Sequence, residues 1–101
     1  MSYRIQRFSS TLRFTLGEII LHELQNPEFR LISITEVSMS KDLKRAMVFV
    51  SSPSDNIEEV LVQLERAKGF IKHLLPRKMK LKYVPELEFH PDERAKPGWP
   101  T

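Results

Sequence analysis

The 101-residue chain has no cysteine and only three glycines. Without cysteine, disulfides and thiolate chemistry are excluded, and a zinc site would need histidine and carboxylate ligands alone. Neither GxxxxGK[ST] nor GxGxxG occurs, which excludes the recognised phosphate-cradling loops. The three histidines, His22, His73 and His90, fall in different predicted elements with no shared ligand spacing. We therefore expect no enzyme, no metal site and no cofactor.

The chain also lacks a long apolar run. No stretch approaches the roughly 20 residues that a membrane helix needs, and the first ten residues are too polar for a signal peptide. The length fits one domain, and the absence of cysteine suits a reducing compartment. We expect a cytoplasmic protein, and nothing in the sequence requires more than a monomer.

Carboxylates are missing from residues 66–82, where the positive charge of the chain is concentrated. This segment carries +7 while the whole chain carries +3, so the remaining residues sum to −4. Ordinary solvent-exposed faces mix both signs of charge, so the bias favours a phosphate-binding surface over a merely solubilising one. The sequence pI of about 9.4 makes nucleic acid the leading partner class, with acidic lipid or an acidic protein as alternatives.

Apolar periodicity predicts five elements: helices over residues 3–25 and 57–75, and strands over residues 31–37, 44–51 and 80–89. The short link between the first two strands favours antiparallel pairing, and the helical link to the third favours parallel pairing. The predicted fold class is α+β, in the order helix, strand, strand, kinked helix, strand. Its three-stranded mixed sheet carries the helices on one face.

Finer features of this fold are also predicted. Asn26-Pro27 and Leu75-Pro76 should end the two helices, and Gly69 should kink the second helix or divide it into two pieces. Apolar residues on both faces of the first two strands, including Met47 and Phe49, indicate that both faces are partly covered. Residues 1–91 are expected to form a single domain, and residues 92–101, which include Trp99, a flexible tail.

The order strand, helix, glycine kink, helix, strand is that of K-homology RNA-binding domains, in which a GxxG turn clamps the RNA backbone. Here the junction reads Arg66-Ala67-Lys68-Gly69, so the usual clamp is missing. Several short sequence motifs also occur in a characteristic order along the chain: Arg7-Phe8, Asn26-Pro27, Thr35-Glu36-Val37-Ser38, Ser40-Lys41-Asp42-Leu43-Lys44, Ala46-Met47-Val48-Phe49-Val50-Ser51, Ala67-Lys68-Gly69-Phe70-Ile71 and Val84-Pro85-Glu86-Leu87-Glu88-Phe89. Together they resemble the ribosome-binding factor A family.

The resemblance implies a type II K-homology fold and a bacterial-type assembly factor that binds the small ribosomal subunit. Members of the family assist late maturation of its ribosomal RNA, including processing of the 5′ end. They act without catalysis, matter most in the cold, and work alongside assembly GTPases. The alternative is a K-homology-like module that binds a protein such as an assembly GTPase through its sheet edge or N-terminal helix.

The predicted RNA-binding residues are the cations of the basic segment, extended by two arginines near the N-terminus. They are Arg66, Lys68, Lys72, Arg77, Lys78, Lys80 and Lys82, with Arg4 and Arg7. His73 belongs to the same basic face. Ala67 and Gly69 are predicted to form the helix kink that orients the second half of the helix.

Overall fold

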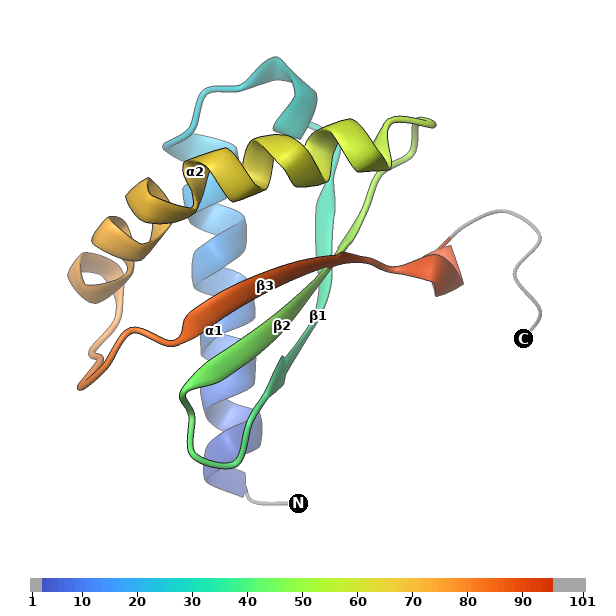
Figure 1. The fold of residues 1–101 in the computed structure, drawn as a ribbon. Helices are drawn as coiled ribbons and strands as arrows, with labels where there is room; N and C mark the ends of the chain where they lie inside the picture. The colour runs from blue at the N-terminus through green and yellow to red at the C-terminus, as the bar shows by residue number, and fades with distance from the viewer. Residues whose placement is uncertain (1–2, 96–101) are drawn as a thin grey trace.

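The computed structural model describes residues 3–95 and contains two long helices and a three-stranded sheet (Figure 1). The elements are α1 (Tyr3–His22), β1 (Ser33–Met39), β2 (Arg45–Ser51), α2 (Ile57–Lys78) and β3 (Glu86–Pro91), with short 3-10 helices η1 (Pro27–Phe29) and η2 (Glu93–Ala95). The strand order is β1-β2-β3, with β1 antiparallel and β3 parallel to β2. The predicted α+β class and mixed sheet are confirmed.

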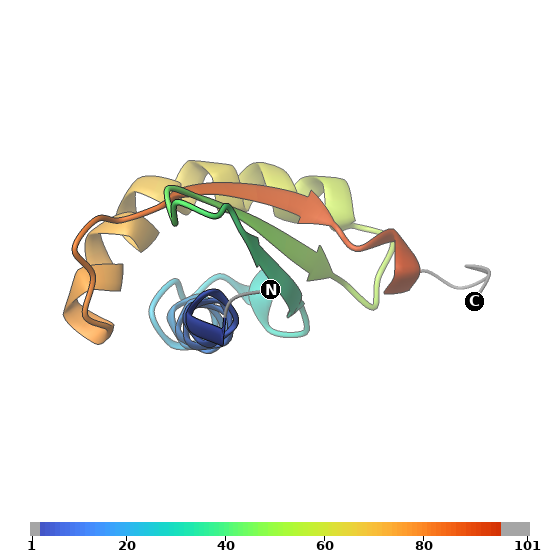
Figure 2. The same ribbon diagram turned by 90° about the horizontal axis from the view of Figure 1, so that it is seen from below.

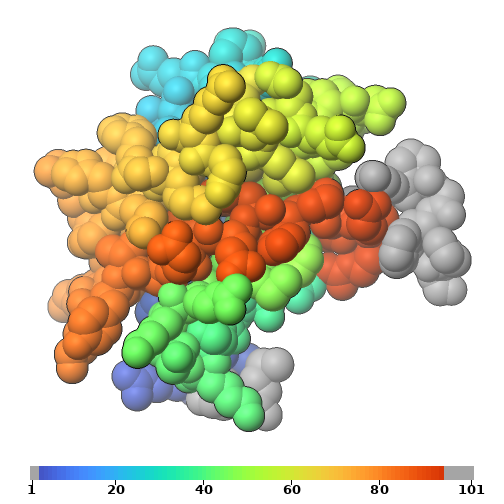
Figure 3. Space-filling view, in the orientation of Figure 1, coloured from blue at the N-terminus to red at the C-terminus, as the bar shows by residue number. Residues whose placement is uncertain are grey.

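The core lies between the two helices and one face of the sheet. Buried residues come from every long element: Leu12, Leu16, Ile19 and Ile20 of α1, Val37 of β1, Ala46, Val48 and Val50 of β2, Val60, Leu64, Ile71 and Leu75 of α2, and Leu87 of β3. In Figure 2, α1 lies below the curved sheet while α2 runs alongside β3. The opposite face of β2 and β3 is not covered by a helix (Figure 3).

Of the two residues that indicated partial cover on both faces of these strands, Phe49 is half-buried and Met47 is exposed. Along β2, buried residues alternate strictly with more exposed ones, because both helices pack on one side of the strand. Met47, which is 39% exposed, lies on the open face. The register of β1 shifts between Ile34 and Glu36, and this irregularity explains why β1 does not alternate cleanly in the sequence.

The third strand is shorter than predicted, because residues 80–85 are not part of the sheet. Pro85 is fully buried and has no backbone N–H to donate to a ladder. Pairing begins one residue later, where the Glu86 N–H donates to the Lys44 carbonyl oxygen at 2.8 Å. The prediction of a strand from Lys80 is therefore wrong in its first half.

Helix α2 continues through both residues that were expected to interrupt it. Pro76 lies inside the helix, and the Met79 N–H donates to the Leu75 carbonyl oxygen at 3.0 Å, which closes the last turn after Lys78. Inside a helix, proline removes its own hydrogen bond and its ring crowds the carbonyl of the residue four positions earlier, here Lys72, which favours a kink. Figure 1 shows that α2 changes direction between its yellow and orange parts.

Contacts with the sheet continue past residue 91, where the sequence analysis ends the domain. Asp92 is buried, its N–H donates to the Val50 carbonyl oxygen at 2.8 Å, and its carboxylate accepts a hydrogen bond from Thr35 Oγ1 at 2.6 Å. Arg94 Nε donates to the same carboxylate at 3.1 Å. Residues 92–95, which the sequence analysis assigns to the tail, therefore pack on the sheet, and residues 96–101 lie outside the described residues.

Candidate RNA-binding surface

Helix geometry divides the predicted cations of α2 between two sides of the helix. At about 100° per residue, Arg66, His73 and Arg77 fall on one side, and Lys68 and Lys72 fall on the side that faces β3. The burial of the side chains agrees with this division. Arg66, His73 and Arg77 are exposed, whereas Lys68 and Lys72 are half-buried. The single basic face that the sequence predicts is thus two separate surfaces on α2.

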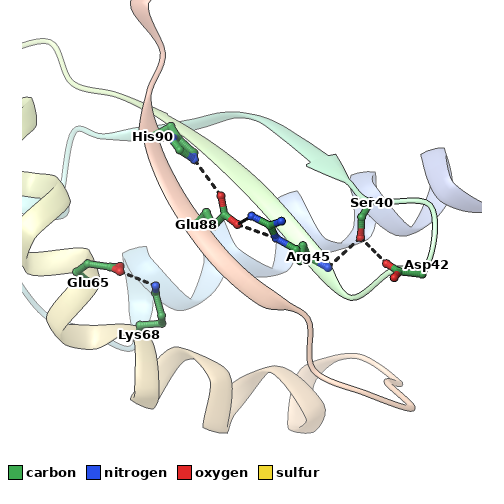
Figure 4. A network of polar contacts seen from close by, with 7 residues as sticks. All are labelled: Ser40, Asp42, Arg45, Glu65, Lys68, Glu88 and His90. Atoms are coloured by element: carbon green, nitrogen blue, oxygen red, sulfur yellow. Dashed lines mark hydrogen bonds and ion pairs between the residues drawn. The ribbon is translucent and has the colours of Figure 1, made fainter.

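Three of the lysines are neutralised by carboxylates. Lys68 Nζ lies 2.5 Å from Glu65 Oε1 (Figure 4), and 5.9 Å from the centroid of the Phe89 ring. Lys72 Nζ lies 3.0 Å from Glu86 Oε2. These partners lie just outside residues 66–82. In the folded protein the segment therefore has carboxylates beside it, although its own sequence contains none.

The third pair joins the two helices. Lys78 Nζ, near the end of α2, lies 3.1 Å from Glu23 Oε1, which follows α1 directly. The two residues are far apart in the sequence, and no local pattern indicates that they meet. Sequence reasoning could not assign this pair, because it depends on how α1 and α2 pack.

The remaining predicted cations have no carboxylate partner within residues 3–95. Arg4, Arg7, Arg66, Arg77 and Lys80 are exposed and take part in none of the ion pairs there. We call these five residues the unpaired basic set. Lys82 is also exposed and without an ion pair in this part of the chain, and its Nζ lies 5.9 Å from the centroid of the Tyr83 ring.

A groove of about 250 Å³ brings members of this set together from distant parts of the sequence. It lies between the first turns of α1 and the segment that follows α2, and its lining consists of Arg4, Arg7, Phe8, Thr11, Met79 and Lys80. No carboxylate is among these residues. The structure thus places Arg4 and Arg7, the predicted extension of the basic surface, beside Lys80 around one hollow.

The open face of the sheet is different, because its charges are balanced. Arg45 Nε donates to Glu88 Oε2 at 2.9 Å, and this hydrogen bond lowers the pKa of the Glu88 carboxyl below its ordinary value. His90 Nε2 lies 3.5 Å from Glu88 Oε1, and its ring is 5.8 Å from that of Phe49. Figure 4 shows this row and the nearby turn, where Ser40 Oγ donates to Asp42 Oδ1. Phosphate recognition is therefore better supported on the unpaired basic set than here.

The described part of the chain was also compared with what a metal site and a membrane span require. Residues 3–95 contain no group of three or more histidine, cysteine, aspartate or glutamate side chains placed to hold a metal ion. Within the same residues, neither helix is long and apolar enough to cross a membrane.

Known proteins of one family match nearly the whole chain. The sequence model of the family described as ribosome-binding factor A matches residues 4–98. The ribosome-binding factor A of Coxiella burnetii is 42% identical over 94 residues, covering 92% of this chain and 79% of that protein. The protein of the same name from Halothermothrix orenii is 37% identical over 97 residues, covering 94% of this chain and 80% of the relative.

Solved structures extend the likeness to the fold. The crystal structure of ribosome-binding factor A from Thermus thermophilus superimposes with a TM-score of 0.79 and 28% identity, covering 88% of this chain and 97% of that one. A homology model of the Thermus thermophilus factor, fitted into a cryo-EM map of a 30S–RbfA complex, gives a TM-score of 0.69 and 30% identity over 87% of this chain and 93% of that one. With the family match over residues 4–98, these likenesses show that the chain belongs to the ribosome-binding factor A family.

Proposed function

We propose that this protein binds the small ribosomal subunit, with the unpaired basic set lying against ribosomal RNA. The observation that carries the proposal is the convergence of Arg4, Arg7 and Lys80 on one groove without a carboxylate. Unpaired lysine and arginine side chains can neutralise phosphates without first giving up an internal partner. The related factor in a complex with the 30S subunit supports the choice of partner.

The proposed role is assistance in late maturation of the small-subunit ribosomal RNA, including processing of its 5′ end, without catalysis. A basic surface can hold an immature RNA arrangement through contacts to the backbone and through shape, without a reacting group. We place this activity in the cytoplasm and assign it to a monomer. A functional link to an assembly GTPase belongs to the same proposal.

The ion-paired lysines have a secondary place in this surface. Lys68, Lys72 and Lys78 can exchange their carboxylates for RNA phosphates, but each exchange leaves a carboxylate unpaired and close to the RNA. Lys82 is exposed and can contribute directly. Ala67 and Gly69 lie in α2 between Arg66 and Arg77, where a change in helix direction would set the angle between these arginines.

A second candidate function is binding of a protein partner such as an assembly GTPase. It is favoured by a hollow of about 390 Å³ between α1 and β1, whose lining includes Phe14, Leu21, Ile32 and Ile34. Phe14 is 70% exposed and Leu21 is 53% exposed, and β1 is an edge strand of the sheet. Apolar side chains beside a free strand edge are typical of sites that receive an extended protein segment.

Co-sedimentation with isolated small subunits, large subunits and joined ribosomes tests the proposed partner. We expect the purified protein to pellet selectively with small subunits in the absence of any other factor. Equal pelleting with all three particles would mean that the basic surface has only a general affinity for nucleic acid. No pelleting with any particle would contradict the proposal and favour the protein-binding alternative.

A further inference from the structure

An aromatic side chain lies among the unpaired cations of α2. Phe70 is 48% exposed and follows Arg66 by four residues, while His73 and Arg77 follow it by three and seven. These spacings place all four side chains on one side of a helix with 3.6 residues per turn. Over about 16 Å from Arg66 to Arg77, this side of α2 therefore presents an aromatic ring with a cation before it and two basic side chains after it.

No carboxylate of α2 shares this part of the helix surface. Glu65 precedes Arg66 by one residue, which turns its side chain away by about 100°, and it is paired with Lys68. Towards the N-terminus the same side of α2 continues with Val62 and Glu59. The basic and aromatic stretch thus begins at Arg66. We call Arg66, Phe70, His73 and Arg77 the α2 ridge.

Gly69 adds an observation that does not depend on charge. A Cβ built on Gly69 would meet no atom within 4 Å, so packing inside the protein does not require glycine there. Glycine in a helix interior costs about 1 kcal/mol relative to alanine. Beside Phe70 it leaves an uncovered strip of backbone, which allows a ligand to approach the helix closely.

We infer that Phe70 stacks on an unpaired base of ribosomal RNA while Arg66 and Arg77 hold phosphates on either side of it. This inference rests on the proposed function, since it names the form of RNA that the same surface takes. Exposed aromatic rings between cations bind single-stranded nucleic acid by stacking and charge, whereas a base inside a duplex has both of its faces covered. RNA carries a phosphate at every nucleotide, so a single strand can meet both arginines while one of its bases stacks on the ring.

The test is the affinity of the Phe70→Leu variant for a short single-stranded RNA of mixed sequence and for the same sequence as a duplex. We expect a loss of about fivefold to a hundredfold for the single strand, with an unchanged salt dependence and little change for the duplex. Phe70→Tyr keeps the ring and should restore binding. Val62→Ala removes apolar surface at an exposed position of α2 before the ridge and should leave both affinities unchanged.

Two results would overturn the inference: Phe70→Leu binding the single strand as the wild type does, or losing affinity equally for the duplex. A variant that binds both RNAs normally but no longer pellets with small subunits would assign Phe70 to a protein contact instead. Thermal unfolding of each variant shows whether the fold is kept. Failure of the proposed function would be seen separately, as wild-type protein that binds no small subunits.

Discussion

Lysine and arginine side chains with the same formal charge have different surroundings in this protein, so we expect them to contribute differently to RNA binding. Lys72 has a carboxylate at 3.0 Å, whereas Lys80 has none in the described part of the chain and lines a groove with Arg4 and Arg7. Surface ion pairs such as that of Lys72 stabilise a fold little, typically by less than about 1 kcal/mol. Their main effect here is to occupy a cation that would otherwise be available to RNA.

Lys80→Met is predicted to weaken binding to small subunits and to reduce its salt dependence. Loss of one phosphate contact should lower the slope of log affinity against log salt by roughly 0.7–0.9. The matched control is Lys72→Met, which removes the same charge from an ion-paired position and should have a smaller effect. Affinity measured across a salt series checks both variants, and equal effects would show that pairing with Glu86 is irrelevant to binding.

Asp92→Asn is predicted to destabilise the protein by about 1–3 kcal/mol at neutral pH. Asp92 is buried and accepts hydrogen bonds from Arg94 and from Thr35, and these interactions hold its pKa below the ordinary value of 3.8. The asparagine side-chain amide lacks the negative charge that interacts with Arg94. Urea unfolding of both proteins at neutral pH measures the difference.

The same pair of proteins has a predicted pH dependence. Because the pKa of Asp92 is lowered by folding, its carboxylate stabilises the protein above the unfolded pKa, near 3.8, and this contribution is lost as pH falls below it. The stability of the wild type should therefore approach that of Asp92→Asn below about pH 4. A difference that stays constant down to the folded pKa would contradict the role of the charge.

At the scale of single residues, the sequence identified the cations but not their partners. Seven cations between residues 66 and 82 could be recognised in the sequence. Arg66, Arg77 and Lys80 are exposed, as a residue that contacts RNA must be. The pairing of Lys78 with Glu23 depends on the packing of α1 against α2, which no local pattern encodes. For the same reason, the contact between Thr35 and Asp92 was not predicted.

Among the elements, periodicity predicted every long helix and strand, and errors concern where they end and which faces they bury. Helix α2 continues past Pro76 to Lys78, although proline inside a helix removes a hydrogen bond and favours a kink. Strand β3 begins at Glu86 because Pro85 cannot donate to the sheet. Partial cover of both faces of β2 was predicted, but not that Phe49 would be half-buried and Met47 exposed, because this depends on the assembled layers.

Gly69→Ala tests what glycine contributes to α2. The added methyl group meets no atom within 4 Å, and alanine favours the helix, so the free energy of unfolding should rise by about 0.5–1 kcal/mol. Chemical denaturation measures this change. A lower free energy of unfolding would instead mean that the bend of α2 requires glycine, as the sequence analysis predicted.

For the molecule as a whole, the fold class could be predicted because element order and link length restrict the topology. The short link between β1 and β2 predicted antiparallel pairing, and the helical link between β2 and β3 predicted parallel pairing. Both pairings are observed. The sequence could not show which of the predicted cations lie together. Folding brings Arg4 and Arg7 beside Lys80 and separates Lys68 and Lys72 from Arg66 and Arg77.

The central claim is that the unpaired basic set, rather than total charge, binds the small subunit. The most direct test is the affinity of an Arg7/Arg77/Lys80→Glu variant for small subunits over a salt series. Its control, Arg13/Arg30/Lys41→Glu, makes the same change in net charge at exposed cations outside the set.

We predict that the first variant loses most of its affinity and much of its salt dependence, while the control stays close to the wild type. Thermal unfolding should show both variants folded, because all six positions are exposed. Equal losses in the two variants would contradict the account and assign binding to net charge alone.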